Sequence, residues 1–82
     1  MTDNEFNKKY LPYLEEGHYG CSLGGGEVVD YLDKEFEKLT KLPSFSYSQI
    51  KLKFGMGRFY CEGVGREIIE RIENSITKFC NN

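Results

Sequence analysis

Five residues between positions 47 and 60 combine positive charge with aromatic rings. They are Tyr47, Lys51, Lys53, Arg58 and Tyr60. Ammonium and guanidinium groups bind carboxylates and phosphates, and aromatic rings stack on guanidinium groups or on bases. Because successive side chains of a strand point to opposite faces, this spacing gathers all five on one side of a pair of strands. The pattern predicts a surface for an acidic protein or for a small anionic ligand.

Two alternative explanations apply to the same pattern. The first is a solvated sheet face whose lysines discourage pairing with other strands. The second is that an N-terminal helix bearing Phe6, Tyr10 and Tyr13 covers the aromatic rings.

The charge distribution supports a local basic surface on an acidic chain. Residues 38–61 contain five Lys or Arg residues and no Asp or Glu, a balance of +5. The 82-residue chain has a formal charge of −2, so the remainder carries −7. An acidic balance of this size disfavours a general nucleic-acid-binding protein, and we regard nucleic acid as the third candidate for a partner.

A glycine-rich segment offers a second place for an anion. Ser22, Gly24, Gly25 and Gly26 precede a helix expected to begin at Glu27, where free N–H groups and the helix dipole attract phosphate. The segment lacks the Lys-Ser/Thr pair of a P-loop, and Glu27 in the first turn repels an anion. A flexible connector with a glycine cap is the alternative.

Cysteine and histidine give a weaker indication of metal binding. His18 and Cys21 have the spacing of zinc ligands, and Cys61 and Cys80 are the other thiols. The alternative is that the cysteines are small core residues with free thiols, as expected in the cytoplasm. The chain has one His, and no set of nucleophile, base and orienting residue can be assembled from it. We therefore expect no enzyme activity and no cofactor.

The elements that position these residues follow from periodicity and caps. Thr2-x-x-Glu5 is a capping box, which predicts a short helix over residues 3–10 that Pro12 ends or interrupts before residue 16. Residues 17–26 are expected to form a loop. Apolar stripes at helical spacing then predict helices on either side of the hairpin, the first from Glu27 to about residue 39 and the second ending near residue 80.

Between the two helices, period-two alternation over residues 45–62 predicts a β-hairpin. A turn at Gly55-Met56, or alternatively at Met56-Gly57, fits the glycines. Either turn gives the same two faces, the outer one carrying the five residues named first. The inner face is expected to carry Ile50, Leu52, Phe54, Phe59 and Cys61.

These elements define one α+β domain over residues 1–82. It consists of an N-terminal helical segment (1–16), a glycine-rich loop (17–26) and an α-β-β-α core (27–80) with both long helices on one face of the hairpin. No stretch of the sequence is apolar for long enough to cross a membrane, and the N-terminus does not have the pattern of a secretory signal. A cytoplasmic location is expected.

The hairpin sequence resembles a family of short bacterial and phage domains. Residues Ile50 to Gly55 and Arg58 to Tyr60 match its signature, I/V-K-x-K-F-G-x-x-R-F-Y, and the resemblance covers residues 26–80. It implies the α-β-β-α order and no particular activity. Relatives commonly end in Cys-x-x-Cys, whereas this chain has only Cys80, so the resemblance implies no metal site here. The phage association implies action in a host cytoplasm on host machinery.

The sequence therefore predicts a non-enzymatic binding module for an acidic protein surface. The alternative is a small-ligand binder that sequesters a nucleotide or another anionic signal. Because 82 residues offer little concavity, such a ligand would be expected at the interface of an oligomer.

Overall fold

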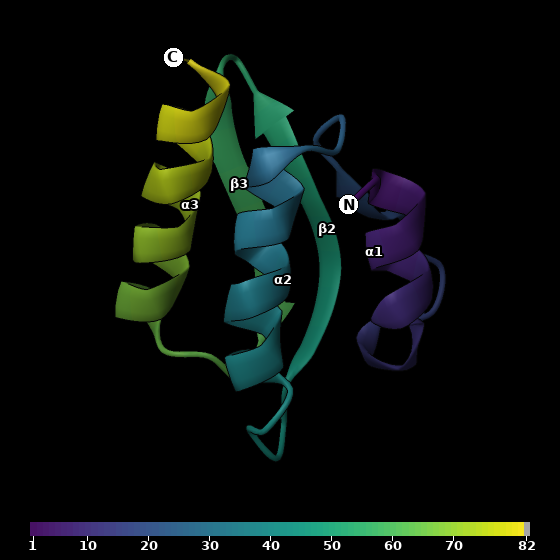
Figure 1. Ribbon diagram of the computed structural model, residues 1–82. Helices are drawn as coiled ribbons and strands as arrows, with labels where there is room; N and C mark the ends of the chain where they lie inside the picture. Colours follow the sequence, from purple (N-terminus) through teal and green to yellow (C-terminus); the bar gives the residue numbers. More distant parts are fainter. Residues whose placement is uncertain (82) are drawn as a thin grey trace.

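Three helices and a three-stranded sheet make up the fold of the computed structural model, which describes residues 1–81 (Figure 1). The elements are α1 (Asp3–Lys9), the 3₁₀ turn η1 (Leu11–Tyr13), β1 (Gly20–Ser22), α2 (Glu27–Leu39), β2 (Ser46–Lys53), β3 (Met56–Glu62) and α3 (Arg66–Cys80). The sheet order is β1-β2-β3. Helices α2 and α3 lie side by side over one face of the sheet, and α1 lies next to α2 (Figure 1).

The N-terminal helix begins and ends as predicted. The Thr2 side chain accepts from the backbone N–H of Glu5, and the Glu5 carboxylate accepts from that of Thr2, which completes the capping box. The helix ends at Lys9, and Pro12 lies in the 3₁₀ turn that follows. Beyond it, Leu14 forms an isolated bridge with Tyr47, so no helix continues to residue 16.

The first strand corrects the prediction that residues 17–26 form a loop throughout. Gly20, Cys21 and Ser22 pair in parallel with Gln49, Ile50 and Lys51 of β2. The strand is short and begins with a glycine at φ +76°, so it has no periodicity of its own. It forms because β2 offers a free edge on one side and Asn7 of α1 bonds Cys21 on the other.

The hairpin is present, but both predicted turns are wrong. Lys53 pairs with Met56, which places the turn at Phe54-Gly55. Both turn residues have positive φ, as a type I′ turn requires. Gly57 lies in β3, where it pairs with Leu52, and a Cβ there would lie 2.7 Å from the carbonyl oxygen of Glu73 and 2.7 Å from the Ile76 side chain. Its role is to let α3 approach β3.

Two residues of the hairpin lie on the opposite side from the predicted one. A bulge in β2 between Tyr47 and Gln49 reverses the alternation, so Tyr47 is fully buried on the inner face instead of the outer one. Phe54, expected on the inner face, lies in the turn and is 94% exposed. Alternation alone predicts neither change, since a bulge and a shifted turn both alter the count.

The core lies between the helices and the inner face of the sheet, and Phe36 of α2 is at its centre. The ring of Phe36 contacts five other rings at centroid distances of 4.8 to 5.6 Å, namely those of Phe6, Tyr10, Phe45, Tyr47 and Phe59. The predicted stripe of α2 is buried throughout, and α3 contributes Ile72 and Ile76. No helix of residues 1–81 has the length and apolarity needed to cross a membrane.

Candidate binding surface

The outer face of the sheet brings together four of the five predicted binding residues. Arg58 lies directly opposite Lys51, Tyr60 is opposite Gln49, and Lys53 is opposite Met56. All of these side chains share a parity that is opposite to that of the buried Ile50 and Phe59. We call Gln49, Lys51, Lys53, Arg58 and Tyr60 the outer patch.

The packing of α1 decides the second alternative differently for the two aromatic residues, because the ring of Phe6 packs against Tyr47, with centroids 6.4 Å apart, but not against Tyr60. Phe6 of α1 and Tyr10, the C-cap residue of that helix, are buried against Phe36 of α2, on the inner side of the sheet. The N-terminal helix therefore does not cover the aromatic residue of the outer patch, and the Tyr60 side chain is 42% exposed.

The cations of the outer patch have no carboxylate partner among residues 1–81. The six ion pairs within these residues involve other groups, and none includes Lys51, Lys53 or Arg58. Like charges directly across a strand pair repel, and Lys51 faces Arg58 in this way. This part of the surface would therefore gain from contact with negative charge.

Side chains bond backbone groups at three positions along the two edge strands of the sheet. On β1, the Asn7 amide accepts from the N–H of Cys21 at 2.6 Å and donates to its carbonyl oxygen at 3.0 Å, as a neighbouring strand would. On β3, the N–H of Gly57 donates to Thr77 Oγ1 and that of Phe59 to Glu73 Oε2. Strand addition at these positions is thus blocked.

The glycine-rich segment does bind an anion, but the anion is a side chain of the same protein. The Asp3 carboxylate accepts from the N–H groups of Leu23, Gly24 and Gly25 at 2.8 to 3.2 Å. Burial raises the pKa of Asp3, and the backbone bonds from Gly24 and Leu23 and the Cys21 thiol outweigh it, so the net pKa is lowered.

The Gly26 N–H donates to the carbonyl oxygen of Met1. Together with the three amides bonded to Asp3, this contact fastens the glycine-rich segment to the start of α1. Ser22 of the predicted phosphate loop instead pairs with Lys51 in the sheet.

The four residues considered as zinc ligands lie in different surroundings. Cys21 is buried and donates to Asp3, and burial and the adjacent carboxylate raise the pKa of its thiol. Burial also raises the pKa of Cys61, to about 11. His18 lies 3.8 Å from Glu15 at the surface, and Cys80 closes α3. Within residues 1–81 there is no group of three or more His, Cys, Asp or Glu side chains that could hold a metal ion.

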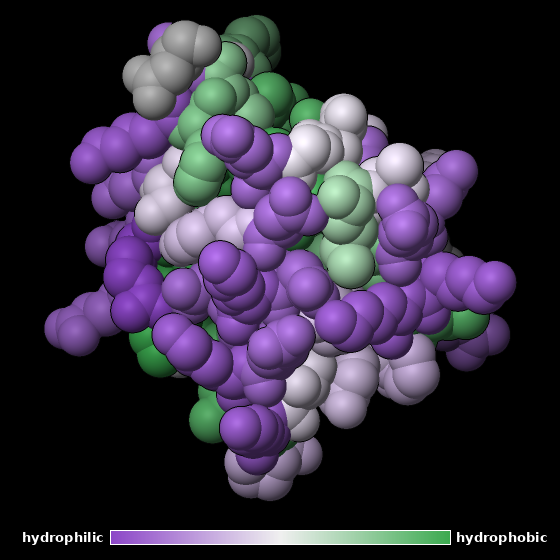
Figure 2. Space-filling view, viewed as in Figure 1, coloured by the Kyte–Doolittle hydropathy of each residue, from purple (hydrophilic) through white to green (hydrophobic). Residues whose placement is uncertain are grey.

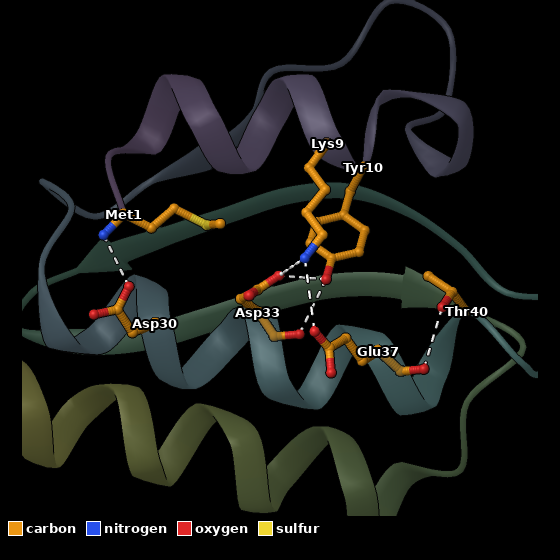
Figure 3. A network of polar contacts seen from close by, with 7 residues as sticks. All are labelled: Met1, Lys9, Tyr10, Asp30, Asp33, Glu37 and Thr40. Atoms are coloured by element: carbon orange, nitrogen blue, oxygen red, sulfur yellow. Dashed lines mark hydrogen bonds and ion pairs between the residues drawn. The ribbon is translucent and has the colours of Figure 1, made fainter.

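A polar network between α1 and α2 was not predicted from the sequence (Figure 3). Asp33 accepts from the Tyr10 hydroxyl and from Lys9 Nζ, the latter at 2.8 Å, and the N-terminal ammonium lies 2.8 Å from Asp30. Burial and the bond to Asp33 raise the pKa of Tyr10 to about 12. The network positions α1 on α2, and its only sequence signal is the position of Asp30 and Asp33 one turn apart on the exposed side of α2.

The tip of the hairpin and the end of α3 carry exposed apolar side chains, which the sequence does not predict as a site. Phe54, Met56, Leu52 and Phe79 are all more than one third exposed. Leu52, Phe79, Leu23 and Val28 line a hollow of about 450 Å³ beside the tip. Figure 2, which views the molecule from the helix side, shows hydrophobic atoms gathered at this end of a largely hydrophilic surface.

A second hollow, of about 650 Å³, lies between β3 and α3 next to Arg58 and Tyr60. Its lining includes four carboxylates, those of Glu15, Glu62, Glu70 and Glu73, against the guanidinium groups of Arg58 and Arg66. The excess of negative charge disfavours a phosphate or nucleotide in this hollow.

Comparison with known proteins adds no relative: no protein-family model, no curated protein and no solved structure matches this chain significantly. The resemblance of the hairpin to short bacterial and phage domains stays a prediction.

Proposed function

We propose that this chain is a non-enzymatic binding module whose outer patch engages an acidic surface of a partner protein. The observation that carries the proposal is the pair Lys51–Arg58, which lies on the open face of the sheet without a carboxylate within 4 Å among residues 1–81.

Negative charge on a partner would relieve the repulsion between the cations of the outer patch. Two cations directly opposite each other destabilise a strand pair, and Lys53 adds a third charge one alternation further along β2. A carboxylate placed between Lys51 and Arg58 would convert this repulsion into two attractive contacts, of which the one to Arg58 can be bidentate. Such complementarity raises the association rate and selects against basic partners.

The geometry favours a protein over the other candidate partners. Small anions bind in concave sites, and the hollow next to the outer patch is such a site. This hollow is lined by four glutamates, and the amides of the glycine-rich segment are already bonded to Asp3. Three cations on a chain of net charge −2 give a nucleic acid little counterion release to gain from.

A titration with a 12-residue polyglutamate peptide tests the proposal. We expect the amide resonances of residues 49–60 in isotope-labelled protein to shift, and the shifts to weaken with added salt because exposed charges are screened. The triple variant Lys51→Glu/Lys53→Glu/Arg58→Glu should bind about tenfold or more weakly.

The matched control is Lys8→Glu/Lys34→Glu/Lys38→Glu, which changes the net charge equally at three exposed lysines that make no ion pair within residues 1–81. It should bind like the wild type, apart from a small general charge effect. Equal weakening in both triple variants, or shifts centred outside residues 49–60, would contradict the proposal.

A further inference from the structure

Phe54 combines two properties that a structural role does not explain. Its side chain is 94% exposed, so it contributes almost nothing to the core. Its backbone has φ +55°, and Phe54 is the one residue other than glycine with positive φ among residues 1–81. A type I′ turn prefers Asn, Asp or Gly at this position, and an aromatic residue there is strained. Asn, Asp or Gly at position 54 would therefore make the protein more stable than Phe54 does.

The surroundings of Phe54 are those of an interface centre. Met56, Leu52 and Phe79 are exposed at the same end of the molecule, and Leu52 and Phe79 line the 450 Å³ hollow. The outer patch begins in the next residue pair, Lys53 with Met56. Aromatic residues, Met and Arg are enriched at protein interfaces, and a few buried anchors supply most of the binding energy.

We propose that Phe54 is the anchor of the interaction, and that it inserts into an apolar pocket of the partner protein whose rim carries the carboxylates bound by the outer patch. This inference rests on the proposed function and adds the apolar half of the partner's chemistry. The rigid type I′ turn holds the ring away from its own core, so the ring is already placed for insertion and little conformational entropy is lost on binding.

A protein fits this surface better than a membrane or a second copy of the chain. The charged side chains lie on the outer face of the sheet, whereas Phe54 lies in the turn at the end of the hairpin. The pair Lys51–Arg58 lies two residue pairs, about 7 Å, behind the pair next to the turn. A planar bilayer touching the tip leaves that outer face in water, while a protein surface can cover both.

The test is a selection from a yeast-displayed library of random 15-residue peptides, with the fluorescently labelled protein as the probe. We expect the enriched peptides to combine Asp or Glu with a large apolar residue. Individual clones should bind Phe54→Asn about tenfold or more weakly than the wild type. They should bind Tyr19→Asn unchanged, because Tyr19 is an exposed aromatic (81%) outside the tip and the outer patch.

Folding is controlled within the same experiment. Asn suits the turn, so Phe54→Asn should raise the melting temperature by about 5 °C, and a loss of binding then cannot reflect unfolding. Phe54→Gly, which also tolerates positive φ, provides a second variant with the same expectation.

The outcomes separate this inference from the function on which it rests. Acidic peptides without an apolar residue, bound equally by Phe54→Asn but lost with Lys51→Glu/Lys53→Glu/Arg58→Glu, would overturn the anchor and leave the proposed function standing. Peptides indifferent to the triple variant would overturn both. Binding of the wild type to phosphatidylserine vesicles, or a dimer in light scattering, that disappears in Phe54→Asn would overturn the inference in favour of a membrane or a second copy.

Discussion

Two turns of this protein contain residues with positive φ, but they differ in what their residues contact. In the segment of Gly24, Gly25 and Gly26, every glycine has positive φ, and the amides of residues 23–26 are bonded to Asp3 and Met1. In the hairpin turn, Phe54 and Gly55 also have positive φ, but Phe54 presents its side chain to solvent.

The difference indicates which turn is structural and which is available for binding. The glycine-rich segment has its anion already, supplied by α1, and its role is to fasten the start of the chain to α2 and β1. In the hairpin turn, the backbone of Phe54 is strained, and its large apolar ring is exposed next to unpaired cations. Natural proteins retain unfavourable local features of this kind where function requires them.

The largest expected effect on stability comes from removing the Asp3 carboxylate from the amides of the glycine-rich segment. Asp3→Ala removes a charged acceptor from three backbone N–H groups, and we expect it to lower the free energy of unfolding by about 2 kcal/mol. For a chain of this size that is a decrease of roughly 8–16 °C in the melting temperature. Calorimetry gives the value, and an unchanged melting temperature would mean that the segment does not depend on Asp3.

The same contact should make stability depend on pH in a defined window. The folded-state pKa of Asp3 is lowered, so its carboxylate stabilises the fold above the ordinary aspartate pKa of about 4. That contribution is lost as the pH falls from about 4 through the lower folded-state pKa. Denaturant titrations of wild type and Asp3→Asn should differ most at pH 6 and converge once the pH has fallen below the folded-state pKa of Asp3. A difference independent of pH would show that the charge of Asp3 is not what matters.

In the hairpin turn the expected sign is reversed. Phe54→Asn relieves backbone strain and removes almost no buried surface, so it should raise the free energy of unfolding by about 1 kcal/mol. Phe54→Ala, which keeps the strain, serves as the control and should change stability little. If Phe54→Asn were destabilising, the ring would have a packing role, and the contrast between the two turns would disappear.

The smallest effect concerns the buried Tyr47 hydroxyl. It is the one buried side-chain polar atom of residues 1–81 without a hydrogen-bond partner, and burial raises the pKa of Tyr47 to about 12. Tyr47→Phe removes an unsatisfied group while keeping the ring that stacks on Phe45, so we expect stabilisation of about 0.5 kcal/mol. Chemical denaturation resolves a change of this size, and a loss above 1 kcal/mol would indicate a partner such as an internal water.

Local patterns in the sequence predict the parts of the fold that depend on near neighbours. The capping box at Thr2 and Glu5, the stripe of α2 and the alternation around Ile50 all describe contacts within a few residues, and each is confirmed. Such patterns do not predict contacts between residues that are far apart in the sequence. β1 exists because β2 and Asn7 bond it from both sides, and Gly57 pairs with Leu52 in β3, where its lack of a side chain lets α3 approach closely.

In the candidate site, too, local patterns predict some residues and long-range contacts determine the others. Alternation alone places Lys51, Lys53, Arg58 and Tyr60 on one face. It misplaces Tyr47, because the bulge that turns this residue inward has no signature in the residue types. The alternation also predicts Phe54 on the inner face, whereas the register of the hairpin places Phe54 in the turn, where it is exposed. The Asp3 contact could have been suspected from an acid near the N-terminus, since glycine-rich amides attract any anion, including one from the same chain.

The central claim, that the outer patch is the binding surface, is tested most directly by comparing the two triple charge reversals for affinity to the polyglutamate peptide. We expect a loss of about tenfold or more for Lys51→Glu/Lys53→Glu/Arg58→Glu and near wild-type binding for Lys8→Glu/Lys34→Glu/Lys38→Glu. Equal affinities of the two variants, both folded by calorimetry, would contradict it.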